Sequence, residues 1–299
     1  MTIAAGLRSN SGVLMCADTQ ISGGDVNTAQ SKLFAFNAPL AGLNVIVSFA
    51  GTVANCRSVI GKIYNSFNSV DPCDGSLDDM KVSERIEEVV RTYHEQHLYK
   101  HPHYGYSGGP VVYLLIAVQY RSGGKPYKTS LFSTSETNVT QHGNYAFIGA
   151  GESIANYIVE PLAYLPLTAM PTKHVILLAD HMLHQVKRFV PGCGGASQFK
   201  WMGDDGAFHP SATQMYMPEL YSSTFRRIMA DLFYAAADLD KDDRLVSLGL
   251  ELTDKRIKEI REEQRSEVER RAKLGSRICD LPVIATPWPL DNPVNERKT

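Results

Sequence analysis

The chain has 299 residues, of which 43% are hydrophobic and 21% are charged. This composition predicts an ordinary globular protein with enough apolar material for a core. Lys and Arg number 30 against 32 Asp and Glu, which gives a net charge of −2. No basic field favours a nucleic-acid partner, and no acidic excess favours disorder.

The cysteines are widely spaced and odd in number: Cys16, Cys56, Cys73, Cys193 and Cys279. This pattern fits neither a disulfide framework nor a zinc ribbon, and it favours a reducing compartment. The start of the chain lacks a basic segment followed by a long apolar one, and no apolar run of about 18 residues follows. We therefore expect a cytoplasmic protein with no membrane and no nucleic-acid partner.

The first part of the chain predicts strands. Residues 3–7 and 13–17 are strand-like runs on either side of a turn, and polar and glycine residues then interrupt the pattern. Strand-like runs return at residues 32–36 and 44–50, and the second of these ends at Gly51.

Helical periodicity begins at residue 53. Apolar residues recur at three- and four-residue spacing over residues 53–67 and 82–93, as expected for helices that lie on a sheet. Further strands are predicted at 111–120, 128–133 and 145–148, and further helices at 154–162 and 174–189. Blocks of strands that alternate with pairs of helices indicate an α+β sandwich of antiparallel sheets flanked by helix pairs.

The pattern changes near residue 197. Residues 218–237 carry an apolar helical stripe, and residues 254–273 are dominated by charges of both signs, which is typical of a solvated helix. Four prolines in residues 280–299 exclude a regular helix there. We therefore predict a first domain over residues 1–197 and a C-terminal helical extension with a Pro-rich tail over residues 198–299.

Thr2 follows Met1 at the head of the first strand-like run. Removal of the methionine would leave one residue with both a hydroxyl and a free α-amine. A threonine hydroxyl is a weak nucleophile at neutral pH, and an amine with a pKa of about 7.7–8.0 can accept its proton. Thr2 could thus be nucleophile and base at once, although many chains begin with this dipeptide without any catalytic role.

Asp18, Lys32 and Gly51 can supply what such a nucleophile needs. Lys32 offers a positive charge that lowers the pKa of the amine and favours ionisation of the hydroxyl, and Asp18 can fix the lysine. Gly51 ends a strand just before a helix, so its N–H can meet the oxyanion of a substrate carbonyl. Taken alone, each residue also has a common structural explanation as a turn, a solvated charge or a conformational glycine.

Five segments resemble the proteasome β-subunits and their bacterial relatives, which are N-terminal nucleophile (Ntn) hydrolases. The segments are 2–6 (TIAAG), 12–19 (GVLMCADT), 31–34 (SKLF), 49–54 (FAGTVA) and 148–151 (IGAG). The order of elements agrees over residues 2 to about 200. The most specific feature is the interval between Thr2 and the second segment.

This resemblance implies a fold and a set of roles. The fold would be a four-layer αββα sandwich. Thr2 would be the nucleophile after removal of Met1, Lys32 its charged partner, Asp18 the carboxylate that orients Lys32, and the Gly51 amide the oxyanion donor. The substrate side-chain pocket would lie near four residues and would favour apolar groups; these residues are Ile21, Phe34, Phe49 and Val53.

The resemblance also implies partners. Members of the family assemble into rings, so a homo-oligomeric ring is expected. The chain contains no nucleotide-binding loop, so an ATPase partner would be a separate protein. No cofactor is expected.

The chain departs from the family at groups that support the threonine. Ala150 stands where active subunits have a serine between two glycines. Residues 190–195 (VPGCGG) correspond to the Asp-x-x-Ser-Gly-Gly element, so Val190 and Cys193 replace its carboxylate and its hydroxyl. The segment between Asp18 and Lys32 is also shorter than in the family. The replacements remove hydrogen bonds that would hold an exposed amine.

Histidine pairs invite a metal interpretation, which the spacing does not support. His101 with His103 and His181 with His184 have no third ligand at metal-site spacing. Residues 238–243 (DLDKDD) lack the glycine and the glutamate of a calcium loop. The sequence therefore predicts no metal site.

These observations lead to one expected function and two alternatives. We expect a threonine-type peptidase that cleaves a peptide or protein substrate through an acyl-enzyme. The first alternative is a catalytically inactive scaffold or interaction subunit of the same fold, which the replaced groups favour. The second is a small-molecule amidase, for which an open site outside a ring would be expected.

Overall fold

The computed structural model describes residues 2–23, 26–38, 42–69, 77–106, 109–121, 126–163 and 166–209, together with Lys258, Glu262 and Ser266. Contacts divide the chain into two compact units, residues 1–224 and 225–299, and the account below concerns the first. The helices expected at 218–237 and 254–273 and the tail at 280–299 lie outside the described residues, apart from those three positions, which are helical and exposed.

The first sheet grows from the hairpin of β1 (Ala4–Ser9) and β2 (Gly12–Asp18). Strand β10 (Tyr145–Ile148) pairs with the outer edge of β1, and β11 (Ser197–Gly203) pairs with the outer edge of β2. The short β12 (Phe208–His209) completes the order β10-β1-β2-β11-β12. These strand pairs are antiparallel, and they make neighbours of segments that are distant in the sequence.

The second sheet follows the order of the chain. It consists of antiparallel strands β5 (Leu33–Ala38), β6 (Leu43–Gly51), β7 (Val112–Arg121), β8 (Tyr127–Ser135) and β9 (Asn138–His142). Its central strands β6 and β7 are rich in β-branched and aromatic residues, which suit a pleated surface that is buried on both faces.

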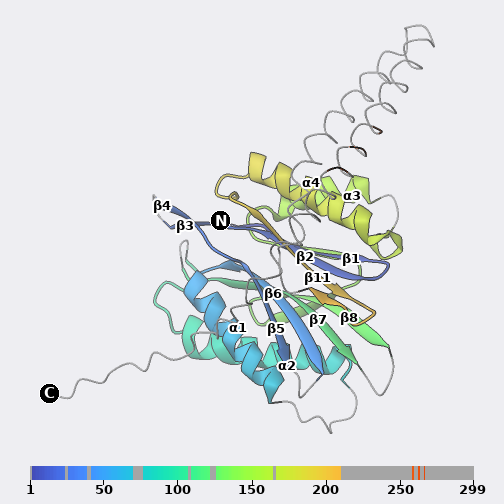
Figure 1. The fold of residues 1–299 in the computed structure, drawn as a ribbon. Coiled ribbons are helices and arrows are strands. Elements are labelled where there is room, and N and C mark those ends of the chain that lie inside the picture. The colour runs from blue at the N-terminus through green and yellow to red at the C-terminus, as the bar shows by residue number, and fades with distance from the viewer. Residues whose placement is uncertain are drawn as a thin grey trace, which may run out of the picture. The chain divides into compact units, whose positions relative to one another are not determined.

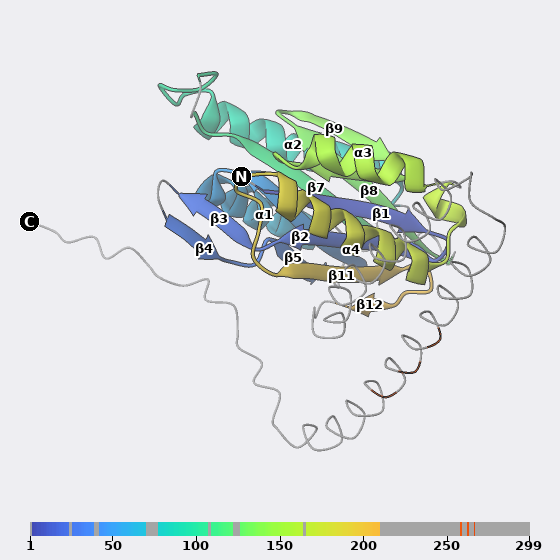
Figure 2. The same cartoon turned by 90° about the horizontal axis from the view of Figure 1, so that it is seen from above.

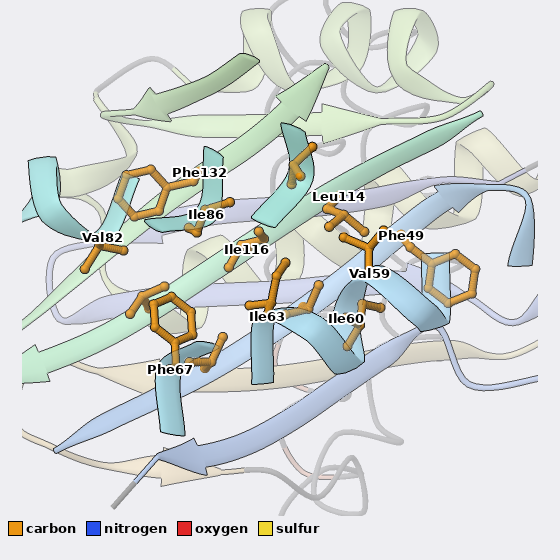
Figure 3. Packing of buried hydrophobic residues seen from close by; sticks show 14 of the residues in the cluster. Phe49, Val59, Ile60, Ile63, Phe67, Val82, Ile86, Leu114, Ile116 and Phe132 are labelled. Atoms are coloured by element: carbon orange, nitrogen blue, oxygen red, sulfur yellow. The ribbon is translucent and has the colours of Figure 1, made fainter. Parts of the chain in front are cut away.

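Helices α1 (Val53–Asn68) and α2 (Asp79–Tyr93) cover one face of the second sheet (Figure 1). Each presents its stripe of apolar side chains to the strands. Burial of one such side chain contributes about 1.5–3 kcal/mol, so the cluster anchors both helices. Figure 3 shows this packing among Phe49, Val59, Ile60, Ile63, Phe67, Val82, Ile86, Leu114, Ile116 and Phe132.

Helices α3 (Glu152–Leu162) and α4 (Thr172–Phe189) cover the first sheet, with a short turn η3 (Leu167–Ala169) between them. Figures 1 and 2 place this pair on the opposite side of the sheets from α1 and α2. The fold is therefore of the mixed α/β kind. None of the helices in the described ranges is long and apolar enough to cross a membrane. The core beneath them includes Ile3, Leu7, Leu14, Phe147, Val159, Leu178, Met182, Leu183 and Phe199.

A third cluster lies between the two sheets. Small side chains such as Ala4 and Ala17 of the first sheet meet Ile46, Ala50 and Leu115 of the second. Because alternate residues of a strand point to opposite faces, each of these strands contributes both to this cluster and to one beneath a helix pair. Strand β2 is buried along its whole length for that reason.

Four helices appear where the periodicity predicts them, but several strands do not follow from local pattern. The hairpin of β3 (Gln20–Gly23) and β4 (Val26–Ala29) lies in a segment whose polar and glycine residues suggested a break. Strand β9 is polar and largely exposed, so it carries no apolar alternation. Helix α2 also continues into a π-helical turn, η2 (His94–Leu98), which the sequence did not indicate.

The first sheet also continues past the predicted domain boundary. Strand β11 pairs with β2 from Ser197–Asp18 to Gly203–Gly12, so residues 198–209 belong to the same sheet as the N-terminal hairpin. Strand β11 mixes polar and apolar residues and lies between β2 and β12.

Candidate active site

Lys32 and Asp18 form a buried ion pair that joins the start of β5 to the end of β2. Lys32 Nζ lies 2.7 Å from Asp18 Oδ1, and both side chains are fully buried. The same ammonium donates to Thr2 Oγ1. The structure thus brings together three residues that the sequence singled out. Because a buried ion pair contributes little net stability, the hydroxyl that it contacts is the better explanation for its presence.

The backbone holds Thr2 and its neighbour firmly. The amide of Ile3 donates to Asp18 Oδ1 at 3.1 Å, and the amide of Asp18 donates to the Ile3 carbonyl at 3.2 Å. On the other side, the Gly151 amide donates to the Thr2 carbonyl at 3.3 Å. Gly149 has φ 99°, and a Cβ there would lie 2.4 Å from the Thr2 carbonyl oxygen, so a glycine is required.

The second carboxylate oxygen of Asp18 is bound by a turn that precedes β11. The Gly194 amide donates to Asp18 Oδ2 at 3.0 Å. The turn is fixed in place because the Gln20 amide donates to the Gly194 carbonyl at 3.1 Å and the Ala196 amide donates to Thr19 Oγ1 at 2.8 Å. Both oxygens of the carboxylate are therefore occupied by donors.

Two further side chains support this arrangement. Lys187, in the last turn of α4, donates to the Gly195 carbonyl at 3.0 Å and to Ser197 Oγ at 2.8 Å. The backbone amide of Lys32 donates a hydrogen bond to Gln198 Oε1 at 3.0 Å. Sequence reasoning missed both residues. The sequence shows the paired glycines at 194–195, but the contacts of this turn form only because β11 lies beside β2.

Burial governs the protonation of the site. It lowers the pKa of the Lys32 ammonium, and the Asp18 carboxylate opposes that shift. Burial raises the pKa of the Cys193 thiol to about 11, with a further rise from Asp18 and an opposing effect of Lys32. Burial raises the pKa of Cys16 as well. Both thiols are protonated at neutral pH and are weak nucleophiles.

Gly51 is exposed at the end of β6 with φ 120°, a region that disfavours side chains. A Cβ would lie 2.3 Å from the Val111 carbonyl oxygen. Gly51 is paired with Val112, while the next amide, that of Thr52, donates to Val111 at 2.8 Å. In such an antiparallel register the Gly51 N–H points away from β7, toward the side where the chain enters β5.

The residues expected around the substrate side chain are placed as follows. Phe34 and Phe49 lie on neighbouring strands with ring centroids 6.0 Å apart, and Phe34 and Val53 pack at the margin of the core under α1. Phe49 is almost fully buried in that core. Ile21 is half-buried on the β3–β4 hairpin, which forms a separate two-stranded sheet.

The replaced family positions have ordinary structural surroundings. Ala150 is exposed between Gly149 and Gly151, and Val190 packs at the margin of the core under α4. Cys193 is 5% exposed within that core. In the described ranges, no group of three His, Cys, Asp or Glu residues is arranged to hold a metal ion.

Comparison with solved structures shows that the chain has a fold similar to that of Anbu proteins. The helical assembly of the Anbu complex from Pseudomonas aeruginosa gives a TM-score of 0.62 at 16% identity, covering 79% of this chain and 95% of that one.

Anbu from Yersinia bercovieri, described as an ancestral beta-subunit, gives a TM-score of 0.58 at 15% identity and covers 76% of this chain and 96% of that one. A mutant of Anbu from Hyphomicrobium sp. strain MC1 gives 0.59 at 16% identity, with 77% and 97% covered. No protein-family model matches the sequence, and a search of curated proteins finds no match. The likeness at this identity concerns the fold.

Proposed function

We propose that this protein is a threonine-type Ntn hydrolase that cleaves a peptide or amide bond after removal of Met1. The observation that carries the proposal is the contact of Lys32 Nζ with Thr2 Oγ1 while the same ammonium is paired with the buried Asp18. A cation aimed at a hydroxyl favours its ionisation, and this is the main requirement for a threonine nucleophile.

The reaction would proceed in two steps. Thr2 Oγ1 attacks the substrate carbonyl and passes its proton to the free α-amine of Thr2, which returns it to the leaving amine as the C–N bond breaks. The acyl group is then an ester of Thr2, and water hydrolyses that ester with the same amine as base. Lys32 stabilises the developing alkoxide, and the Gly51 N–H stabilises the oxyanion.

The architecture belongs to the same proposal. We infer a four-layer αββα sandwich, which is supported by the separate clusters under α1 and α2, between the sheets, and under α3 and α4. Homo-oligomeric assembly is supported by the helical assembly recorded for the Pseudomonas aeruginosa relative. A closed ring, a separate ATPase, a protein substrate and a cytoplasmic location stay predictions.

The second candidate is an inactive scaffold or interaction subunit of this fold. It is favoured by Ala150, Val190 and Cys193, which offer none of the strong hydrogen-bonding groups that the family resemblance places there. The two candidates differ in the state of the N-terminus. A hydrolase needs a free Thr2 amine, whereas a scaffold has no need to lose Met1.

The test combines mass measurement with covalent labelling. Intact mass of the purified protein should show loss of Met1, and a peptide bearing a threonine-directed electrophile should add one label to Thr2. The Thr2→Ala variant should keep its fold by circular dichroism and take no label. Retained Met1, or equal labelling of the variant, would exclude Thr2 as the nucleophile.

A further inference from the structure

Arg57 stands on α1 one turn beyond Val53, on the same face of the helix, because residues four apart are neighbours. Its side chain is exposed, yet it is held on two sides. The guanidinium carbon lies 6.0 Å from the ring centroid of Phe34, and Nη2 donates to Gln30 Oε1 at 2.9 Å. A charge fixed by a ring and an amide loses little freedom when it binds a ligand.

The two residues that hold Arg57 flank Lys32 along the chain. Gln30 precedes Lys32 by two residues and Phe34 follows it by two, while Val53 is two residues beyond Gly51. The Gly51 N–H points toward the side where the chain enters β5, which is the side that carries Gln30. A substrate whose carbonyl meets that N–H would place a neighbouring side chain against Phe34 and Val53, with Arg57 at the far end.

Among the charges at the site, Arg57 is the one that can distinguish substrates by their charge. Asp18 neutralises the Lys32 ammonium at 2.7 Å. In the described part of the chain, no carboxylate forms an ion pair with Arg57, whose guanidinium donates to the neutral amide of Gln30. A guanidinium has five N–H donors in a planar fork that matches a carboxylate.

We propose that the site selects substrates with an acidic side chain on the residue whose carbonyl is attacked. The apolar stem of that side chain packs on Phe34 and Val53, and its carboxylate binds Arg57. This inference rests on the proposed hydrolase function, and it refines the apolar preference expected from the sequence. The walls are apolar, but the end of the site is cationic.

The catalytic test uses peptides that differ only in the residue before the cleaved bond, namely Glu, Gln, Leu or Lys. The wild-type kcat/KM should favour Glu over Gln by roughly two- to five-fold, as for a partly exposed charge pair, and the ratio should fall as salt is raised. Arg57→Gln should abolish the Glu preference, and Arg57→Glu should favour Lys.

The matched control is Arg91→Gln, which removes the same charge from an exposed position in the last turn of α2. It should leave the ratio unchanged. Equal kcat/KM for Glu and Gln in the wild type, or a ratio that survives Arg57→Gln, overturns the inference.

A binding measurement separates this inference from the function on which it rests. The Thr2→Ala variant cannot form the acyl-enzyme, so fluorescence anisotropy with the same peptides reports binding alone. Tighter binding of the Glu peptide to Thr2→Ala, reversed when Arg57→Glu is added, supports the inference. A wild type that binds in this way but cleaves nothing would defeat only the hydrolase proposal. Equal binding of all peptides, or binding of none, overturns the inference.

Discussion

The Gly194 amide donates a 3.0 Å hydrogen bond to Asp18 Oδ2 across a separation of 176 residues. Asp18 uses its other oxygen for Lys32, so the turn at the end of α4 sets the position of the carboxylate and thereby of the ammonium at Thr2. Lys187 ties that turn to the helix. A residue that never contacts Thr2 can therefore influence its hydroxyl.

Lys187→Met removes two hydrogen bonds and keeps the length of the side chain. We expect kcat to fall roughly ten-fold with little change in KM, since a small displacement of Asp18 misplaces the reacting groups. Steady-state kinetics measure both constants. Lys173→Met, an exposed lysine in the first turn of α4, is the control and should keep wild-type kcat. If both variants lose activity equally, the turn has no special role.

The pH dependence of hydrolysis should show the lowered pKa of Lys32. Burial lowers this pKa despite Asp18, so the ammonium loses its proton below the ordinary value of about 10.4. Since the charged form stabilises the alkoxide, kcat should fall on the alkaline side, starting below that value. Titration of Lys32 by NMR of labelled lysine provides the assignment. An alkaline limb that does not coincide with the Lys32 titration would exclude this role.

The same pKa of Lys32 should affect stability in the opposite sense, so that the free energy of unfolding rises with pH where kcat falls. The unfolded chain binds this proton more tightly than the folded one, so the free energy of unfolding should rise with pH between the lowered pKa and about 10.4. Lys32→Met should remove that rise in denaturant melts recorded over the same range. A rise of equal size in the variant would assign it to other groups.

Gly51→Ala places a Cβ 2.3 Å from the Val111 carbonyl oxygen at a φ of 120°. We expect a loss of about 1–3 kcal/mol of stability and a large fall in kcat, because the strand end must shift and take the Gly51 N–H with it. Gly42→Ala is the matched control, since Gly42 also has positive φ, 61°, but open space around it. It should lose some stability and keep kcat. Equal kinetics in the two variants would contradict the oxyanion role.

Ala150→Ser returns a hydroxyl to the exposed position between Gly149 and Gly151, whose backbones lie against the Thr2 carbonyl. One added hydrogen bond near the amine contributes about 1 kcal/mol, so labelling of Thr2 should accelerate roughly five-fold. The labelling rate followed by intact mass measures this effect. Ala150→Val, which adds bulk without a hydroxyl, should not accelerate it, and acceleration by both variants would point to packing.

Asp79 ties α2 to the second sheet through donors from Tyr120 and Gln141, each at 2.7 Å, and from Lys128 and Ser130. Burial raises the pKa of this carboxyl, but the four hydrogen bonds outweigh it and lower the pKa to about 2. The resulting stability is present above the unfolded value of about 3.9 and is lost as pH falls toward about 2.

Asp79→Asn should therefore lower the free energy of unfolding near neutral pH by about 1 kcal/mol, a value limited by solvent screening of a partly exposed group. The difference from wild type should vanish near pH 2, and denaturant melts at several pH values measure it. A constant difference between Asp79→Asn and wild type at all pH values would contradict the explanation.

Local periodicity was enough to predict the four helices and most strands of both sheets. The apolar stripes of α1 and α2 and the apolar runs in β1 and β2 arise from neighbouring residues, so they can be recognised without knowledge of the fold. Strand β9, the β3–β4 hairpin and β11 escaped prediction. Their residues are polar or mixed, and pairing with other strands makes them regular.

The sequence by itself determined that Thr2, Asp18, Lys32 and Gly51 form a candidate site, because their order and spacing resemble a known family. Tertiary structure decided how that site is supported and what faces it. Gly194, Lys187 and Gln198 reach it through the pairing of β11 with β2, and the packing of α1 on β5 brings Arg57 against Phe34. Contacts between segments that are distant in the chain leave no local periodicity, so only the folded arrangement reveals them.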